Sequence, residues 1–176
     1  MDISPEQITL ARPVTPKVHE ANVLDWLKNT QARFDLITGL DSVERFHKPE
    51  VLPFVDACFL ARKPRGKLVL QTPNAGSLWG GGRGQRYGDF TYELRFNSNS
   101  LIRLLKLAGF EYIELRETRP VTWGYSYRSS IRYIMWQPIR MILKLWNSAE
   151  TGGAGNGVFT RNFLISATEH RILKQD

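Results

Sequence analysis

Two apolar segments separated by a helix-like stretch and a Gly/Pro turn constrain the fold of this chain most. Phe34–Leu40 is a mostly apolar run of the kind that forms a strand buried on both faces. A helix is expected from near Pro49, because apolar residues recur there at helical spacing. Residues 63–66, Lys-Pro-Arg-Gly, favour a turn, and residues 67–72 form a second apolar run. The pattern predicts the crossover unit of a parallel α/β sheet.

Shorter elements continue this alternation on both sides. A Ser-Pro start and amphipathic patterns predict helices over 4–12, 23–28 and 98–108, the last ended by Gly109. Alternation of apolar and charged residues predicts a strand over 112–117, and further strands are expected over 18–21 and 159–167.

Two segments interrupt the alternation. Residues 75–97 form a long glycine-rich loop, which we expect on the substrate side. It lacks the Gly-Lys-Ser/Thr of a phosphate-binding loop, and the next helix begins too far away to hold a phosphate. Residues 125–157 form a basic amphipathic helix and a Gly-rich linker inserted before the last strand.

Composition limits the classes of protein that fit. The chain has 176 residues, 42% of them hydrophobic, which suits a single globular domain. Its one cysteine, Cys58, lies among apolar residues and is expected to be buried. The three histidines show no metal-ligand spacing, so we expect no metal site. The net charge of +7 permits anionic partners, but no nucleic-acid-binding motif accompanies it, and no nucleic acid is expected.

The runs FDLITGLDSVERF and ARKPRGKLVLQTPN resemble the central segment of class I S-adenosylmethionine-dependent methyltransferases, of the bacterial small-molecule or glycan-lipid type. The resemblance implies an α/β, Rossmann-like fold, mostly parallel, with an antiparallel C-terminal strand. It also implies that residues 1–176 are one incomplete domain, truncated at its N-terminal side. The first strand with its glycine-rich motif, and most of the second strand, would be absent.

The same resemblance implies a set of residues that bind S-adenosylmethionine. Asp2 looks like the acid that accepts hydrogen bonds from the ribose hydroxyls, and Ile3 would pack on the adenine. Asn22 and Val23, in Glu-Ala-Asn-Val, resemble the positions that meet the adenine edge. The segment that resembles the lining of the methionine moiety consists of Gly39, Leu40 and Asp41. Each polar residue has a structural alternative: a free terminus for Asp2, a helix N-cap for Asn22 and a turn cap for Asp41.

The end of the 75–97 loop holds the candidate catalytic residues. An oxygen nucleophile benefits from a base within reach of its proton. In the related proteins a histidine usually stands at the position of Tyr92, and another at the position of Arg45. Their replacement leaves Asp89, Tyr92 and Glu93 as the polar candidates, with an ordinary surface role as the alternative.

Residues 126–146 combine basic, apolar and aromatic side chains at helical spacing. This pattern is typical of a helix that lies in a membrane surface. The alternative is a core-packed helix with a solvated basic face, kinked at Pro138.

From these patterns we expect an S-adenosylmethionine-dependent methyltransferase that methylates an oxygen of a small or lipid-linked metabolite. We expect this chain to be a fragment with reduced or no activity alone, and a partner chain could supply the missing N-terminal half. The alternative is a non-catalytic binding or scaffolding module, or half of a split enzyme. The expected location is cytoplasmic, with peripheral contact at the inner face of the membrane through 126–146.

Overall fold

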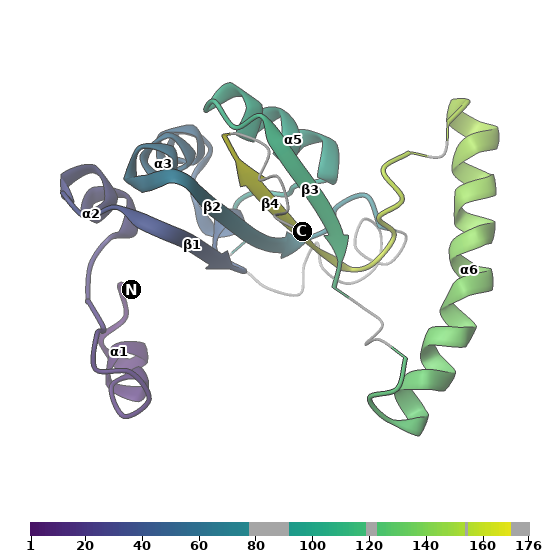
Figure 1. Ribbon diagram of the computed structural model, residues 1–176, viewed down its shortest axis with the longest axis horizontal. Helices are drawn as coiled ribbons and strands as arrows, with labels where there is room; N and C mark the ends of the chain where they lie inside the picture. The colour runs from purple at the N-terminus through teal and green to yellow at the C-terminus, as the bar shows by residue number, and fades with distance from the viewer. Residues whose placement is uncertain (78–91, 119–122, 154, 170–176) are drawn as a thin grey trace.

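The computed structural model describes residues 1–77, 92–118, 123–153 and 155–169, which form an α/β arrangement around one sheet (Figure 1). The sheet has four strands in the order β1-β2-β4-β3. Their bounds are β1 Phe34–Leu40, β2 Arg62–Pro73, β3 Tyr112–Glu117 and β4 Asn162–Thr168. β1 pairs in parallel with β2, while β4 is antiparallel to both β2 and β3. Three strands therefore point the same way and the C-terminal strand opposes them, which confirms the expected sheet.

Helices follow the sequence pattern closely. They are α1 Pro5–Ala11, α2 Val23–Asn29, α3 Lys48–Ala61, α5 Ser98–Leu107 and α6 Tyr127–Thr151, with a short 3-10 turn, η1, over Val43–Arg45. Gly109 follows α5 with φ +99°, a conformation that glycine adopts without strain, so it ends the helix as predicted. No helix among the described residues is long and apolar enough to span a bilayer.

The hydrophobic core lies between one face of the sheet and helices α3 and α5. Alternate residues of β2 and β4, such as Leu70 and Ile165, are fully buried there against Val55 and Leu105. Cys58 belongs to this core, as predicted, and burial raises the pKa of its thiol to about 12. The burial of these apolar side chains on one face fixes the pairing register of the strands, because a shift by one residue would turn them toward the opposite face.

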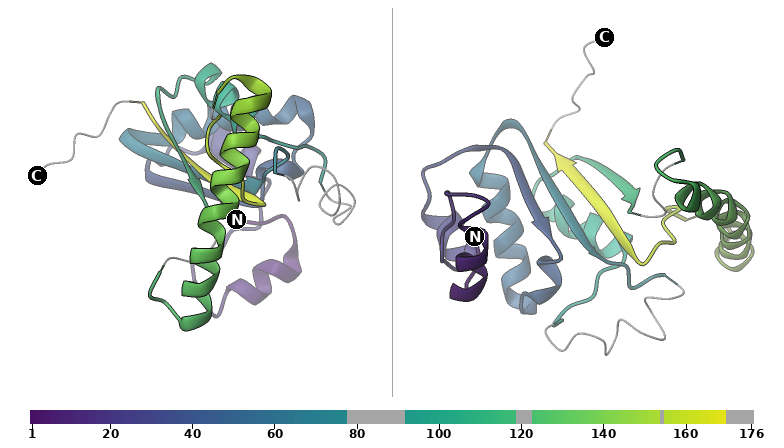
Figure 2. Two further views of the ribbon diagram at one scale, coloured as in Figure 1. Left: turned by 90° about the vertical axis from the view of Figure 1, so that its right-hand side faces the viewer. Right: turned by 90° about the horizontal axis from the view of Figure 1, so that it is seen from below.

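The prediction that Phe34–Leu40 is buried on both faces is wrong for this structure. β1 lies at the edge of the sheet, and its Leu36 and Leu40 side chains are 54% and 64% exposed. Both leucines point to the sheet face opposite the core, since Leu36 pairs with the half-buried Lys67 and Leu40 with Gln71. No described helix covers β1 on that face (Figure 2).

Two further sequence predictions change in detail. Residues 63–66 do not separate a helix from a strand as a free turn; they lie inside β2, where the register with β1 shifts between Phe34 and Leu36. Arg65 has φ +66° there, so the predicted turn geometry occurs as an irregularity of the strand. The expected strand over 18–21 is reduced to one parallel bridge between Asp2 and Glu20.

Helix α6 stands beyond β3, at the end of the molecule opposite β1 (Figures 1 and 2). It continues through Pro138 for 25 residues, and none of its described residues is buried. The alternative of a core-packed helix is therefore wrong. A Ser126 capping box begins the helix and Gly152, at φ +76°, ends it.

Candidate functional site

The turn after β1 is built around a close approach at Gly39. An added Cβ there would lie 2.8 Å from Ser42 Oγ and 2.9 Å from Leu70 Cδ2. Asp41, two residues on, has φ +49° and is held by β2: its backbone N–H donates to the Gln71 carbonyl at 3.0 Å. The Gln71 side-chain amide also donates to the Asp41 carboxylate at 3.1 Å. The carboxyl ends of the two parallel strands are thus tied into one rim.

A buried acid, Glu44, lies directly behind this turn. Its Oε2 accepts a hydrogen bond from Thr72 Oγ1 at 3.0 Å, while Oε1 has no partner among the described residues. Burial raises the pKa of the Glu44 carboxyl. The Glu44 backbone carbonyl accepts hydrogen bonds from the N–H groups of Glu93 and Leu94, at 3.0 and 2.9 Å. The end of the 75–97 loop is therefore fastened to the same rim.

Two of the three candidate catalytic residues come to this rim. The guanidinium of Arg45 lies 5.6 Å from the centre of the half-buried Tyr92 ring. Glu93 is exposed, and its Oε2 lies 3.7 Å from His47 Nδ1. Asp89 lies outside the described residues. The arrangement offers a phenol and a carboxylate beside the carboxyl end of β1.

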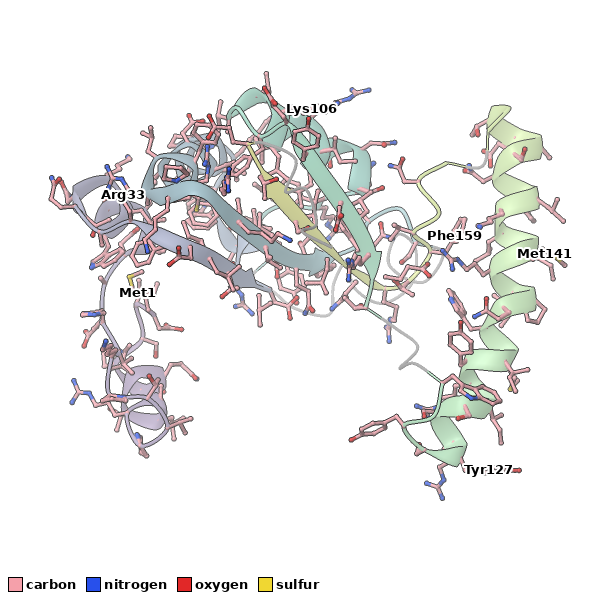
Figure 3. All side chains as sticks on the ribbon, in the orientation of Figure 1. Met1, Arg33, Lys106, Tyr127, Met141 and Phe159 are labelled. Atoms are coloured by element: carbon pink, nitrogen blue, oxygen red, sulfur yellow. The ribbon has the colours of Figure 1, made fainter. Side chains whose placement is uncertain are left out.

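Asp2 and Ile3 lie on a separate segment. The backbone of Asp2 pairs with the segment 19–21, donating to the His19 carbonyl at 3.3 Å and accepting from Ala21 N–H at 3.1 Å. Its carboxylate Oδ1 accepts a hydrogen bond from Ser4 N–H at 2.8 Å. Ile3 is 72% exposed. The N-terminus lies on the β1 side of the sheet, where Met1 is labelled in Figure 3.

Asn22 is the N-cap of helix α2, which is the structural alternative expected for it from the sequence. Its Oδ1 accepts from the N–H groups of Leu24 and Asp25, at 2.9 and 3.4 Å. Its amide NH2 remains to donate, and Val23 beside it is half-buried. An open depression of about 380 Å³ includes this residue in its lining: Ala21, Asn22, Asp25, Trp26, Asn29 and Thr30.

Three features of these residues fit S-adenosylmethionine. Asp2 Oδ2 accepts no hydrogen bond from the described residues, so it can accept one from a ribose hydroxyl. The exposed Leu40 offers apolar surface at the rim. The rule for open α/β sheets places ligands at the carboxyl ends of the strands, where this rim lies.

Sequence reasoning missed Glu44 and Gln71, which hold the rim together. Glu44 stands between Val43 and Arg45 in a run whose helical or loop character the sequence does not decide. The available signal was an acid flanked by apolar Val43 and Phe46, a setting that favours burial. No sequence signal pointed to Gln71, because a polar residue on a strand is ordinarily solvated.

Comparison with solved structures shows the same fold in several methyltransferases. A SAM-dependent methyltransferase from Archaeoglobus fulgidus is 16% identical with a TM-score of 0.65; the match covers 94% of this chain and 72% of that one. A SAM-dependent methyltransferase from Clostridium acetobutylicum ATCC 824 is 11% identical, with a TM-score of 0.58 and the same coverages, 94% and 72%. A third, from Thermotoga maritima, is 14% identical with a TM-score of 0.51, over 82% of this chain and 61% of that one. At these identities the likeness shows the fold alone.

A search of curated proteins finds no match to this chain. A family model described as a methyltransferase domain matches residues 1–115, which is more than half of the sequence. The resemblance seen in the sequence is therefore confirmed, and with it the cofactor class, S-adenosylmethionine. The chain belongs to the class I S-adenosylmethionine-dependent methyltransferase family.

Proposed function

We propose that this protein transfers a methyl group from S-adenosylmethionine to an oxygen of a small or lipid-linked metabolite. The observation that carries the proposal is the rim at the carboxyl end of β1. There the Asp41 turn and the Tyr92–Glu93 segment are fastened to one another through Glu44. The turn that we propose for the cofactor and the polar segment that we propose for the acceptor are thereby held at one edge of the sheet.

On the cofactor side, the proposed roles follow the chemistry of each group. Asp2 holds the ribose hydroxyls through Oδ2, and Ile3 covers one face of the adenine. Asn22 donates from its amide to a ring nitrogen while its oxygen caps α2, and Val23 packs beside it. The remaining group lines the methionine moiety: Gly39, Leu40 and Asp41. When bound, the cofactor supplies the activated methyl group for an in-line displacement.

On the acceptor side, the chain's own residues position the nucleophile and take its proton. Glu93 is exposed, and its carboxylate is the group that we propose accepts the proton of the nucleophile. Tyr92 is held beside Arg45, where its ring can orient an acceptor. Asp89, from the same loop, is the third polar group that we propose for this side.

The proposed lipid-linked acceptor agrees with a further proposal, peripheral contact with the inner face of the membrane through 126–146. This segment lies almost wholly in α6, which carries large apolar side chains on its surface rather than in the core. Such a helix can hold an enzyme where an amphiphilic acceptor is concentrated.

Calorimetric titration with S-adenosylmethionine tests the proposed function. The full chain should release or absorb heat with a one-to-one stoichiometry. Asp2→Ala should weaken binding by roughly tenfold, the loss of a hydrogen bond to a charged group. Asp56→Ala, which removes an exposed acid from α3, is the matched control and should bind as the wild type does. Absence of heat from a folded sample contradicts the proposal.

The exposed edge of β1 favours a second candidate, half of a split enzyme or a scaffolding module. Within the part of the chain that the structure describes, no strand pairs with the outer edge of β1, so this edge offers backbone groups and the exposed Leu36 and Leu40 to another strand. We propose that a partner chain supplies a strand that pairs with the outer edge of β1. Heat of cofactor binding that appears only with an added partner supports the split enzyme; no heat in either case supports the scaffold.

A further inference from the structure

Helix α6 presents an unbroken apolar face to solvent. Side chains spaced by three, four and seven residues share one side of a helix, and on this side they are all apolar. The set is Ile131, Ile134, Met135, Met141, Ile142 and Leu145. Each is exposed; Ile142 and Leu145, near the middle of the face, are 59% and 63% exposed. We call this set the outward face.

The rotation of α6 about its axis is fixed by contacts on the opposite side. Arg140 Nε lies 3.5 Å from Glu117 Oε2 at the end of β3, and Arg140 Nη2 donates to the Gly157 carbonyl at 3.4 Å. Trp136, one helical turn earlier, is half-buried on this side. Met141 therefore points away from the sheet, as Figure 3 shows. The outward face is a property of the folded chain.

The area of the outward face favours binding to a flat surface over binding to a second copy of the chain. A helix of 25 residues is about 37 Å long and about 10 Å wide. Its outward side thus offers roughly 370 Å², as large as the functional patches of monomers. A standard protein interface needs about 800 Å² from each partner, which this face alone does not supply.

The charged side chains beside the outward face indicate which kind of flat surface it binds. Arg128 and Arg132 lie along one border and Lys144 along the other, all three exposed. Large aromatic side chains, Tyr127 at 83% and Trp146 at 69% exposed, stand near the two ends of the helix. Cations at the borders complement lipid phosphates, and aromatic rings favour the boundary between headgroups and acyl chains.

We propose that α6 lies in the surface of an anionic phospholipid membrane, with its outward face inserted and Arg128, Arg132 and Lys144 on the phosphates. This inference deepens the membrane contact stated under the proposed function and rests on it. It does not depend on methyl transfer. The inference specifies which face of α6 is inserted, the charge of the lipid, and the cations that bind the lipid phosphates.

Flotation of the full chain with vesicles, without cofactor, tests the assignment. The chain should float with vesicles of equal parts phosphatidylglycerol and phosphatidylcholine, and far less with phosphatidylcholine alone. Ile142→Glu and, independently, Leu145→Glu should lower the partition coefficient at least tenfold. Lys144→Gln should lower it about fivefold. Leu60→Glu, at an equally exposed leucine on α3, is the matched control and should leave it within twofold.

Three results would overturn the inference. The first is no flotation with the anionic vesicles, and the second is an equal loss for Leu60→Glu. The third is a dimer in vesicle-free solution that Ile142→Glu dissociates, which would make the outward face a contact with a second copy. Calorimetry with S-adenosylmethionine on the same samples separates the proposals: a chain that binds cofactor without floating refutes the membrane contact and leaves the proposed methyl transfer standing. Far-UV circular dichroism checks that each variant remains helical.

Discussion

Substituting Gly39 by alanine tests whether the turn after β1 depends on close packing. The added methyl group would lie 2.8 Å from Ser42 Oγ and 2.9 Å from Leu70 Cδ2, both nearer than real Cβ contacts. Leu70 is fully buried in the core, so it has little room to move. Either the core side of β2 or the turn that carries Asp41 must shift.

The cost of this change follows from overpacking. Forcing one methyl group into a packed site ordinarily costs about 1–3 kcal/mol. In a domain of this size each kcal/mol lowers Tm by about 2–4 °C. Gly39→Ala should therefore lower the free energy of unfolding by about 1–3 kcal/mol and lower Tm accordingly. Because the Asp41 turn moves with it, cofactor binding should weaken as well.

Urea unfolding followed by tryptophan fluorescence measures this loss. The control is Gly153→Ala, because a Cβ at Gly153 meets nothing within 4 Å. That control should change the free energy of unfolding by less than about 0.5 kcal/mol. Equal stability of the two variants would refute the argument that the turn is held by the contacts of Gly39.

Substitutions at Asn22 and Glu44 test the structural roles of these two residues. Asn22→Ala should lower the free energy of unfolding by about 1 kcal/mol because α2 loses its cap, whereas Asn22→Asp keeps a capping oxygen and should cost far less. Urea unfolding of both variants measures the two losses of stability, and equal losses would contradict the capping role. Burial raises the Glu44 pKa, so the wild type should lose stability as pH rises from about 4.5 to the folded-state pKa, since the unfolded chain releases its proton first. Glu44→Gln should lack that loss in unfolding curves measured between pH 4 and 8, and an unchanged pH dependence would contradict the assignment.

Periodicity predicted the elements whose packing is local. The strand at Tyr112–Glu117 alternates apolar and charged residues, and it has the expected bounds. Helix α5 has an amphipathic pattern, an Asn97 cap and Gly109 behind it, and it forms with those limits. In each case the local signals and the tertiary contacts agree.

Features that depend on neighbouring elements were beyond the sequence pattern. The apolar run Phe34–Leu40 has the composition of a strand covered on both faces, but coverage depends on what packs beside it. The α6 pattern fitted both a membrane surface and a core, and tertiary contacts such as Arg140–Glu117 fix which side of the helix faces the sheet. Burial of Glu44 likewise depends on Thr72, a residue 28 positions away.

Chemical-shift mapping of the backbone amides with S-adenosylmethionine tests whether segments far apart in sequence form one cofactor site on the β1 side of the sheet. We expect titration to move the amides of 2–3, 22–23 and 39–41 together, with one dissociation constant, and to leave α6 unmoved. Shifts confined to one of these segments, or centred on α6, would contradict it.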